Sequence, residues 1–295
     1  MPRQPVDIIA KGEMALEEWF RERLNLPAHL QICVKKLMRE TTPILKVEIH
    51  EIVDGVSTEI AYRHQPYDLE NEMLLIGDVR LNDKSYRGLG TLLRYETENL
   101  FLEHYNIRQA QTSPLWEGRY KWVPYGDLPQ YGSTHPSQKY ATVQQFQTGM
   151  RNMFRQFKAH LAGLGGVLPE KYNAQILSII EAMPNDRRAF RKLPDITASY
   201  DEIFPDVAPE TKLAIRGKFS AATNVYEKLL EEEFLSPHDG LIHIGRAVIP
   251  PWDGLFDFTD AESMNLREVA GNQARARLDR TLEIKGFSPP PPTIK

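Results

Sequence analysis

The 295-residue sequence contains a single cysteine, Cys33. One cysteine excludes an internal disulfide framework and a zinc site built on cysteines. Its neighbours Ile32 and Val34 are apolar, which favours a buried thiol with no chemical role.

Long apolar runs are also missing. No run approaches the ~20 residues that a membrane-spanning helix needs, and the apolar part of the N-terminal segment MPRQPVDIIAKGEM is too short for a secretory signal. We therefore expect a cytoplasmic protein that does not interact with membranes.

Several motifs of common enzymes are absent. The eight histidines form neither HExxH nor a pair at i and i+4, so no metal site is predicted. The P-loop, the dinucleotide-binding glycine fingerprint and the Gly-x-Ser-x-Gly elbow do not occur. The net charge of −4 gives no indication of a basic surface for nucleic acid.

The sequence has enough hydrophobic residues to form a core. Hydrophobic residues make up 41% and charged residues 26%, which is typical of a globular protein. Apolar residues at helical spacing predict a helix over 11–25. Segments 30–38, 44–53, 57–63 and 73–81 read as strands, and Asp54-Gly55 predicts a hairpin turn between the second and third.

The segment after residue 81 is the most informative one. A polar turn, NDKS at 82–85, leads to RGLGT at 87–91 and then to an amphipathic run that ends near His104. Glycines let the backbone approach an anion closely, and a helix N-terminus supplies partial positive charge. This order predicts an anion site, to which Arg87 adds a full charge.

The composition changes from about Tyr131 onward. Helical patterns cover 137–162, 169–183 and 218–234, a strand pattern covers 241–249, and a final helix over 261–285 is weakened by Gly271. We therefore predict a core at 1–134 and a helical insertion or subdomain at 135–240. Residues 241–295 would hold a returning strand, a C-terminal helix and a proline-rich tail.

The order of strand, DxRL turn, YRGLGT and amphipathic helix resembles motif A of the GNAT superfamily of N-acetyltransferases. The preceding helix and hairpin fit the same order, as do the short strand at 107–112 and the aromatic segment after it, so the resemblance covers residues 10–127. It implies an α+β fold with a mixed, mostly antiparallel central sheet flanked by helices. The additional helical region has no place in a minimal member.

The resemblance further implies an acyl-CoA-dependent N-acyltransferase, in which an amine substrate directly attacks the thioester. The strand at 73–81 would hold the thioester arm. In the superfamily the first position of the turn motif is Gln or Arg, and Ser85 stands there in this sequence. The pyrophosphate of acetyl-CoA or another acyl-CoA would bind the turn formed by Arg87, Gly88, Leu89, Gly90 and Thr91.

Direct acyl transfer needs a base for the amine and an acid for the departing thiolate. The resemblance assigns the acid to a tyrosine after the fifth strand, and Tyr120 matches it. Glu72 and Asp78 are the base candidates on the central strand. Glu72 could instead be solvated, and Asp78 would be half-buried in an apolar run and need a partner such as Arg80.

Aromatic residues cluster beyond the glycine turn. Trp116, Trp122 and Tyr125 could line a substrate pocket, or they could pack as a satellite core. Trp252 and Asp253 could close the far end of such a pocket, where a carboxylate would meet a cationic amine. They could equally belong to a loop after an edge strand.

Other interpretations stay open. Glu96-Thr97-Glu98 matches the Glu-x-Glu pair of ADP-ribosyltransferases, but it lies in a helical pattern, so we interpret it as a solvated helix face. The chain could be a non-catalytic GNAT-like binding or structural protein that uses residues 116–127 and the helical region for a partner. It could also be a GNAT-like effector that acts on a macromolecule, and a homodimer remains open.

Overall fold

The computed structural model describes residues 7–112, 122–130, 140–212, 214, 241–250 and 252–287. The chain divides into two compact units, which we describe separately. Unit 1 comprises Met1–Thr112 and Phe256–Lys295, and unit 2 comprises Ser113–Leu255. These boundaries extend the predicted insertion, 135–240, at both ends.

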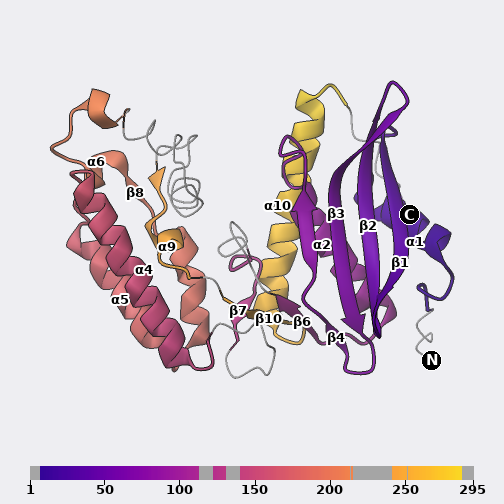
Figure 1. The fold of residues 1–295 in the computed structure, drawn as a ribbon, viewed down its shortest axis with the longest axis horizontal. Coiled ribbons are helices and arrows are strands. Elements are labelled where there is room, and N and C mark those ends of the chain that lie inside the picture. Colours follow the sequence, from indigo (N-terminus) through magenta and orange to yellow (C-terminus); the bar gives the residue numbers. More distant parts are fainter. Residues whose placement is uncertain are drawn as a thin grey trace. The chain divides into compact units, whose positions relative to one another are not determined.

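Unit 1 is an α+β unit with a mixed, mostly antiparallel sheet flanked by helices (Figure 1). Its elements in chain order are α1 (Glu13–Leu24), β1 (Leu30–Arg39), β2 (Thr42–Val53), β3 (Val56–Asp68), β4 (Met73–Leu74), β5 (Asp78–Leu81), α2 (Leu89–His104), β6 (Gln109–Thr112), β10 (Gly254–Asp257) and α10 (Ala261–Ile284).

The sheet of unit 1 runs in the order β1-β2-β3-β4-β6-β10, and β5 also pairs with β3. The pairs β1/β2, β2/β3, β3/β4 and β3/β5 are antiparallel, whereas β4 and β6 are parallel. The two long hairpins, β1/β2 and β2/β3, follow from the alternating pattern of their sequences. The parallel pair requires the crossover helix α2 between its strands.

The core of unit 1 lies between one face of the sheet and the helices α1 and α2 (Figure 1). From α1, Leu16, Phe20 and Leu24 are fully buried, and their spacing of four places them on one helix face. Burial of each such side chain stabilises the fold by about 1.5–3 kcal/mol. Alternate strand residues complete this core: Leu30, Ile32, Val34, Leu45, Val47 and Ile49.

The predicted strand over 73–81 is interrupted in the structure. β4 covers only Met73–Leu74, and pairing with β3 resumes in β5. Gln65 braces the interruption, because its side-chain amide donates to the carbonyls of Pro66 and Leu75 at 2.7 and 2.9 Å. Gly77 fits closely there: a Cβ atom on it would lie 2.4 Å from the carbonyl oxygen of His64.

Unit 2 is mainly helical (Figure 1). Its described elements are β7 (Leu128–Pro129), α4 (Val143–Gly163), α5 (Glu170–Ala182), the 3-10 helix η1 (Arg187–Asp195), β8 (Ala198–Ser199), α6 (Tyr200–Ile203), β9 (Leu241–Ile242), α9 (Ile244–Ala247) and the start of β10. The core is aromatic: the ring of Phe190 contacts those of Phe146 and Trp252, with centroids 5.6 and 5.4 Å away.

The predicted strand over 241–249 is wrong in length and partner. Only Leu241–Ile242 is a strand, and it pairs with β8 in a separate two-stranded sheet. The helix α9 follows at once, and β10 is the strand that returns to the central sheet. The predicted helix at 218–234 and the proline-rich tail lie outside the described residues.

Candidate functional site

The glycine turn joins β5 to α2, as the sequence predicts. Its first half is closed by its own hydrogen bonds: Asp83 accepts from the amides of Ser85 and Tyr86. The amides of Arg87 and Leu89 donate to the carbonyls of Ser85 and Tyr86 at 3.1 and 3.2 Å. These four amides are therefore not available to a ligand.

Three other amides of the turn are not bonded in this way. The N–H groups of Gly88, Gly90 and Thr91 have no acceptor within the described part of the chain. Gly88 is the N-cap of α2 with φ 92°, and no side chain caps this helix end. Uncapped first-turn amides carry the positive end of the helix dipole, so this end of α2 can accept an anion.

The two glycines have different surroundings. A Cβ atom on Gly88 would lie 2.2 Å from the carbonyl oxygen of Ala274 in α10, so this glycine allows two helices to approach closely. A Cβ atom on Gly90 would meet only Val79 Cγ2, at 3.8 Å. Gly90 therefore leaves space beside the open amides, whereas Gly88 is required by packing.

The C-terminal end of α10 also reaches the turn. The ammonium group of Lys285 lies 3.8 Å from the ring centroid of Tyr86 and 3.8 Å from Asp83 Oδ2. The Tyr86 hydroxyl donates to Glu51, and burial of the ring, together with that carboxylate, raises the pKa of Tyr86. Helix α10 thus fixes the turn from one side.

Beyond the strand interruption, β5 is not paired with β6 in the described residues. The parallel pairing of β4 with β6 consists of Met73 with Gln109 and Leu74 with Ala110, and β5 then pairs only with β3. One backbone edge of β5 therefore has no strand partner within the described residues. This edge leads directly into the glycine turn.

Asp78 opens β5 and lies in a different setting from the predicted one. It is exposed rather than half-buried, and its carboxylate accepts a hydrogen bond from the Tyr62 hydroxyl at 2.8 Å. The Tyr62 ring packs against the His64 ring at a tilt of 32°, with centroids 4.7 Å apart. The structure thus brings a carboxylate, a phenol and an imidazole together beside the strand interruption.

Glu72 precedes β4 with φ 54° and is partly buried. Its carboxylate accepts from Arg108 Nε at 2.6 Å and from the side-chain amide of Asn106. Its carbonyl oxygen accepts from the Arg108 amide at 2.8 Å. These contacts tie the start of β4 to the segment before β6, which is a structural role.

The aromatic candidates in unit 2 are largely buried. Tyr125 and Trp252 are 1% and 0% exposed, and Trp122 packs against the same core. Asp253 is buried, and its carbonyl oxygen accepts from the Gln130 amide at 2.8 Å. The strand pair β7/β10 joins the chain after Tyr125 to the chain after Trp252. The rings of Trp122 and Trp252 pack in the hydrophobic core of unit 2, which favours the satellite core over a substrate pocket.

Trp116 and Tyr120 lie outside the described residues.

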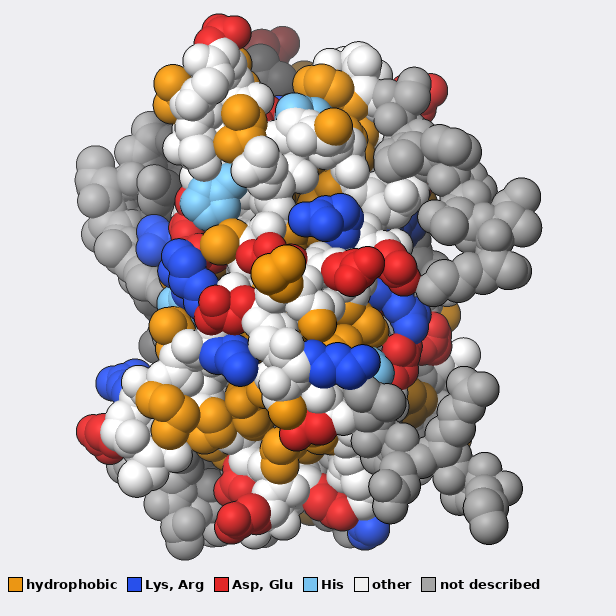
Figure 2. Space-filling view, turned by 90° about the vertical axis from the view of Figure 1, so that its right-hand side faces the viewer, with side chains coloured by type: hydrophobic (Ala, Val, Ile, Leu, Met, Phe, Trp, Pro, Cys, Tyr) orange, Lys and Arg blue, Asp and Glu red, His pale blue; other side chains and the backbone are white. Residues whose placement is uncertain are grey.

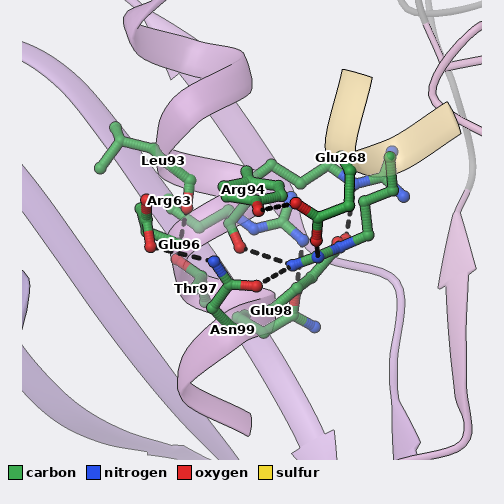
Figure 3. Close-up of polar contacts among 11 residues, drawn as sticks. Arg63, Leu93, Arg94, Glu96, Thr97, Glu98, Asn99 and Glu268 are labelled. Carbon is green, nitrogen blue, oxygen red and sulfur yellow. Dashed lines mark hydrogen bonds and ion pairs between the residues drawn. The ribbon is translucent and has the colours of Figure 1, made fainter. Parts of the chain in front are cut away.

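The sequence did not reveal the buried ion-pair network between α2 and α10. Arg94, Glu98 and Arg267 are at most 1% exposed, and Glu98 accepts from Arg94 Nε at 2.7 Å and from Arg267 Nε at 2.9 Å (Figure 3). Arg267 also donates to the Tyr95 carbonyl and the Asn99 side chain, at 2.8 and 2.6 Å.

The interpretation of residues 96–98 as a solvated face is therefore wrong. Glu96 is 7% exposed, and burial raises the pKa of its carboxyl group. Glu98 is fully buried within the network. The helix that carries them is covered by the sheet on one side and by α10 on another, so local spacing alone gave the wrong environment.

A second charged cluster lies on the strands β1 and β2. Glu48 is 4% exposed and contacts the ammonium groups of Lys46 and Lys35, the latter at 2.9 Å. Burial alone would raise the pKa of Glu48, but hydrogen bonds from the two lysines lower it to about 2. His50 and Glu59 place ligand atoms within 4.8 Å of Glu48, yet the two lysines already neutralise that carboxylate.

Acidic and basic side chains are interspersed on the face of the molecule seen in Figure 2, with no large area of one sign. None of the described helices combines the length and apolar character of a membrane span. No protein-family model matches the sequence, and no curated protein is detectably similar to it.

Proposed function

We propose that unit 1 binds an acyl-coenzyme A and transfers its acyl group to an amine. The observation that carries this proposal is the juxtaposition of two unsatisfied backbone surfaces. The edge of β5 lacks a strand partner within the described residues. It leads into the start of α2, where the amides of Gly88, Gly90 and Thr91 have no acceptor among those same residues.

Each surface suits one part of the ligand. The amide groups of a pantetheine arm can hydrogen-bond to an open strand edge as another strand would. The diphosphate is an anion, for which the amides of Gly88, Gly90 and Thr91 offer donors at the positive end of α2. Arg87 is exposed beside them and adds positive charge.

The acyl transfer would depend on holding the thioester close to the attacking amine. A thioester held along β5 would present its carbonyl carbon near the strand interruption, next to Asp78 and its neighbours. An amine would attack this carbon, the C–S bond would break, and the thiolate would leave as coenzyme A after it gains a proton. Tyr120 remains the predicted acid for that proton.

Gly90 provides the sharpest test, because its surroundings accept a side chain. Gly90→Asp places a carboxylate at the first turn of α2, which favours the helix but repels a diphosphate. Gly90→Asn has the same shape without the charge. Repulsion between unit charges about 4 Å apart costs about 1 kcal/mol in water and about 4 kcal/mol at an effective dielectric constant of 20.

Isothermal titration calorimetry with coenzyme A is the measurement. We expect binding by the wild type and by Gly90→Asn, and a dissociation constant raised at least ~5-fold in Gly90→Asp, the lower end of that repulsion. Absence of binding by the wild type, or equal binding by Asp and Asn variants, would contradict the proposal.

One observation favours a second candidate, a non-catalytic binding protein on the same scaffold. Gly88, the first glycine of the motif, is explained by its contact with Ala274, and the Arg87 and Leu89 amides are bonded within the turn. Under this alternative the wild type binds no coenzyme A. Light scattering and co-purification would then reveal a partner.

A further inference from the structure

Helix α4 of unit 2 has two faces of different character (Figure 1). Its apolar face is buried in the core of that unit and consists of Phe146, Met150, Phe154, Phe157 and Leu161. Thr142 caps the helix, because its side chain accepts a hydrogen bond from the Gln145 amide at 3.2 Å. Packing and capping therefore hold the opposite face of α4 in a fixed position.

That opposite face carries a row of polar and basic side chains. Its members follow one another at intervals of four or three residues, which places them in one line along the helix. All of them are exposed: Gln144, Thr148, Arg151, Arg155 and Lys158. We call the last three the basic stripe. At a rise of about 1.5 Å per residue, the basic stripe is about 10 Å long.

The sequence around the basic stripe contains no acidic residue. None occurs from residue 128 to residue 169, although 40 of the 295 residues of the chain are acidic. Asp127 precedes this interval, and Glu170 follows it at the start of α5, where its carboxylate accepts from the Asn173 side chain at 3.2 Å. The net charge of −4 conceals this local excess of positive charge.

The three cations also have no carboxylate partner among the residues that the structure describes. Arg155 donates to the Asn152 side chain at 3.4 Å, and Lys158 donates to that of Asn173 at 3.1 Å and lies over the Phe154 ring. Other exposed cations do form ion pairs, as in Arg23–Glu103, Arg108–Glu72 and Lys171–Glu202. The charge of the basic stripe therefore stays available to an anionic partner.

The composition of the exposed row distinguishes between kinds of anionic partner. An anionic membrane is bound by helices that insert an apolar face, and the apolar face of α4 is buried in the core. An acidic protein would need aromatic or apolar anchors at the centre of the interface, and the row supplies none. Nucleic-acid interfaces are polar and positively charged, and Arg, Lys, Thr and Gln side chains all bond to phosphates.

Among nucleic acids, duplex DNA fits this face best. Single strands bind by stacking their bases on aromatic rings, and the rings of α4, those of Phe146, Phe154 and Phe157, are buried. The major groove of duplex RNA is too narrow for side chains to enter, whereas that of DNA is about 12 Å wide and admits a helix. Duplex DNA carries one charge per about 1.7 Å of its axis, so the basic stripe can lie along several phosphates.

We propose that the basic stripe of α4 binds the phosphate backbone of duplex DNA, an inference that does not depend on the proposed acyl transfer. Arg151, Arg155 and Lys158 contact phosphates and displace their counterions. Phosphate contacts position a protein on the duplex without reading its sequence, so the binding is independent of sequence.

The test measures fluorescence anisotropy of a fluorescein-labelled DNA duplex of mixed sequence with the whole protein, between about 50 and 200 mM salt. We expect the wild type to bind with a dissociation constant of roughly 1–100 μM at physiological salt. The triple variant Arg151→Gln, Arg155→Gln, Lys158→Gln should bind about tenfold more weakly or worse. Its slope of log affinity against log salt should be smaller by about 2–3, because each phosphate contact contributes about 0.9.

Two controls separate the basic stripe from overall charge. The variant Arg21→Gln, Arg277→Gln, Arg280→Gln removes the same charge from exposed positions of unit 1. It should keep the wild-type salt slope, since charges beyond about 10 Å are screened at 0.1 M salt. Arg151→Lys combined with Arg155→Lys retains the charge and should keep the slope as well. Circular dichroism checks that every variant is folded.

Four outcomes would overturn the proposal. They are no binding of the duplex by the wild type, equal binding by the triple stripe variant, an equal loss in the unit 1 control, and tighter binding of a single-stranded RNA of the same length. Displacement of the labelled duplex by poly-L-glutamate as readily as by unlabelled DNA would also overturn it, because the face would then bind acidic proteins. Weak displacement by poly-L-glutamate, together with the reduced salt slope, supports it.

Discussion

Gly88 lies against the carbonyl oxygen of Ala274, so closely that a Cβ atom on Gly88 would sit 2.2 Å from it. Gly88 also has φ 92°, a conformation that costs an L-residue energy. A second close contact follows along the same two helices, where a Cβ atom on Gly271 would meet the Tyr95 ring at 2.7 Å. Small residues therefore set the distance between α2 and α10.

Gly88→Ala should destabilise unit 1. Overpacking costs about 1–3 kcal/mol, and the left-handed backbone adds about 1–2 kcal/mol, so we expect the free energy of unfolding to fall by roughly 2–5 kcal/mol. Gly90→Ala is the control, and it should be neutral or stabilising because the site is helical and has space. Denaturant unfolding measures both, and equal effects would disprove the assignment of Gly88 to packing.

Arg267→Met should be more damaging than its position near the chain end suggests. It removes the ion pair between Arg267 and the buried Glu98, and with it the bonds to the Tyr95 carbonyl and the Asn99 side chain. Removal of one member of a buried ion pair typically costs about 3–5 kcal/mol. Arg280→Met, on the exposed side of α10, should change the stability by no more than about 0.5 kcal/mol. Similar losses in both variants would show that the network contributes little.

The edge of the sheet at β1 is closed by carboxylates of α1. Glu17 accepts from the Val34 amide at 3.1 Å, and Glu13 accepts from the Lys36 amide at 2.8 Å. Open strand edges promote pairing between chains. We expect Glu13→Ala combined with Glu17→Ala to self-associate in analytical ultracentrifugation. Glu18→Ala, on the exposed side of the same helix, should sediment as the wild type does, and an unchanged double variant would contradict this role.

Glu48 should contribute to acid stability. Its folded pKa is about 2, below the ordinary value of 4.5, so ionised Glu48 stabilises the fold above pH 4.5, and this contribution is lost as the pH falls toward 2. Glu48→Gln should be less stable than the wild type at neutral pH and should lose less stability over that range. Unfolding curves between pH 7 and pH 2 measure this, with Glu59→Gln as the control. Parallel curves for Glu48→Gln and the wild type would refute it.

Local patterns predicted most of unit 1. The helices α1 and α2 and the strands β1 to β3 were predicted from the spacing of apolar residues within each segment. The interruption before β5 was missed, because it depends on the fit of Gly77 against His64 and on the Gln65 side chain. These partners lie on β3, and a linear pattern does not identify them.

The errors at the candidate site have the same origin. Glu98 was assigned to solvent because its partner Arg267 lies 169 residues further along the chain. The returning strand was placed at 241–249 because apolar character does not specify which strand a segment pairs with. The glycine turn at the start of α2 was predictable, since glycines before an amphipathic run mark a helix start without a side-chain cap. The sequence did not reveal that the amides of Arg87 and Leu89 are bonded within the turn, which leaves only those of Gly88, Gly90 and Thr91 without an acceptor in the described part of the chain.

The most direct test of the central claim follows the backbone amides themselves. In a ¹⁵N-resolved NMR titration with coenzyme A, the signals of Gly88, Gly90 and Thr91 should shift saturably, while those of Gly55 and Gly163, which lie in other turns or helix ends, stay in place. If saturating coenzyme A leaves the three signals where they are, the end of α2 does not bind the diphosphate and the transferase proposal is wrong.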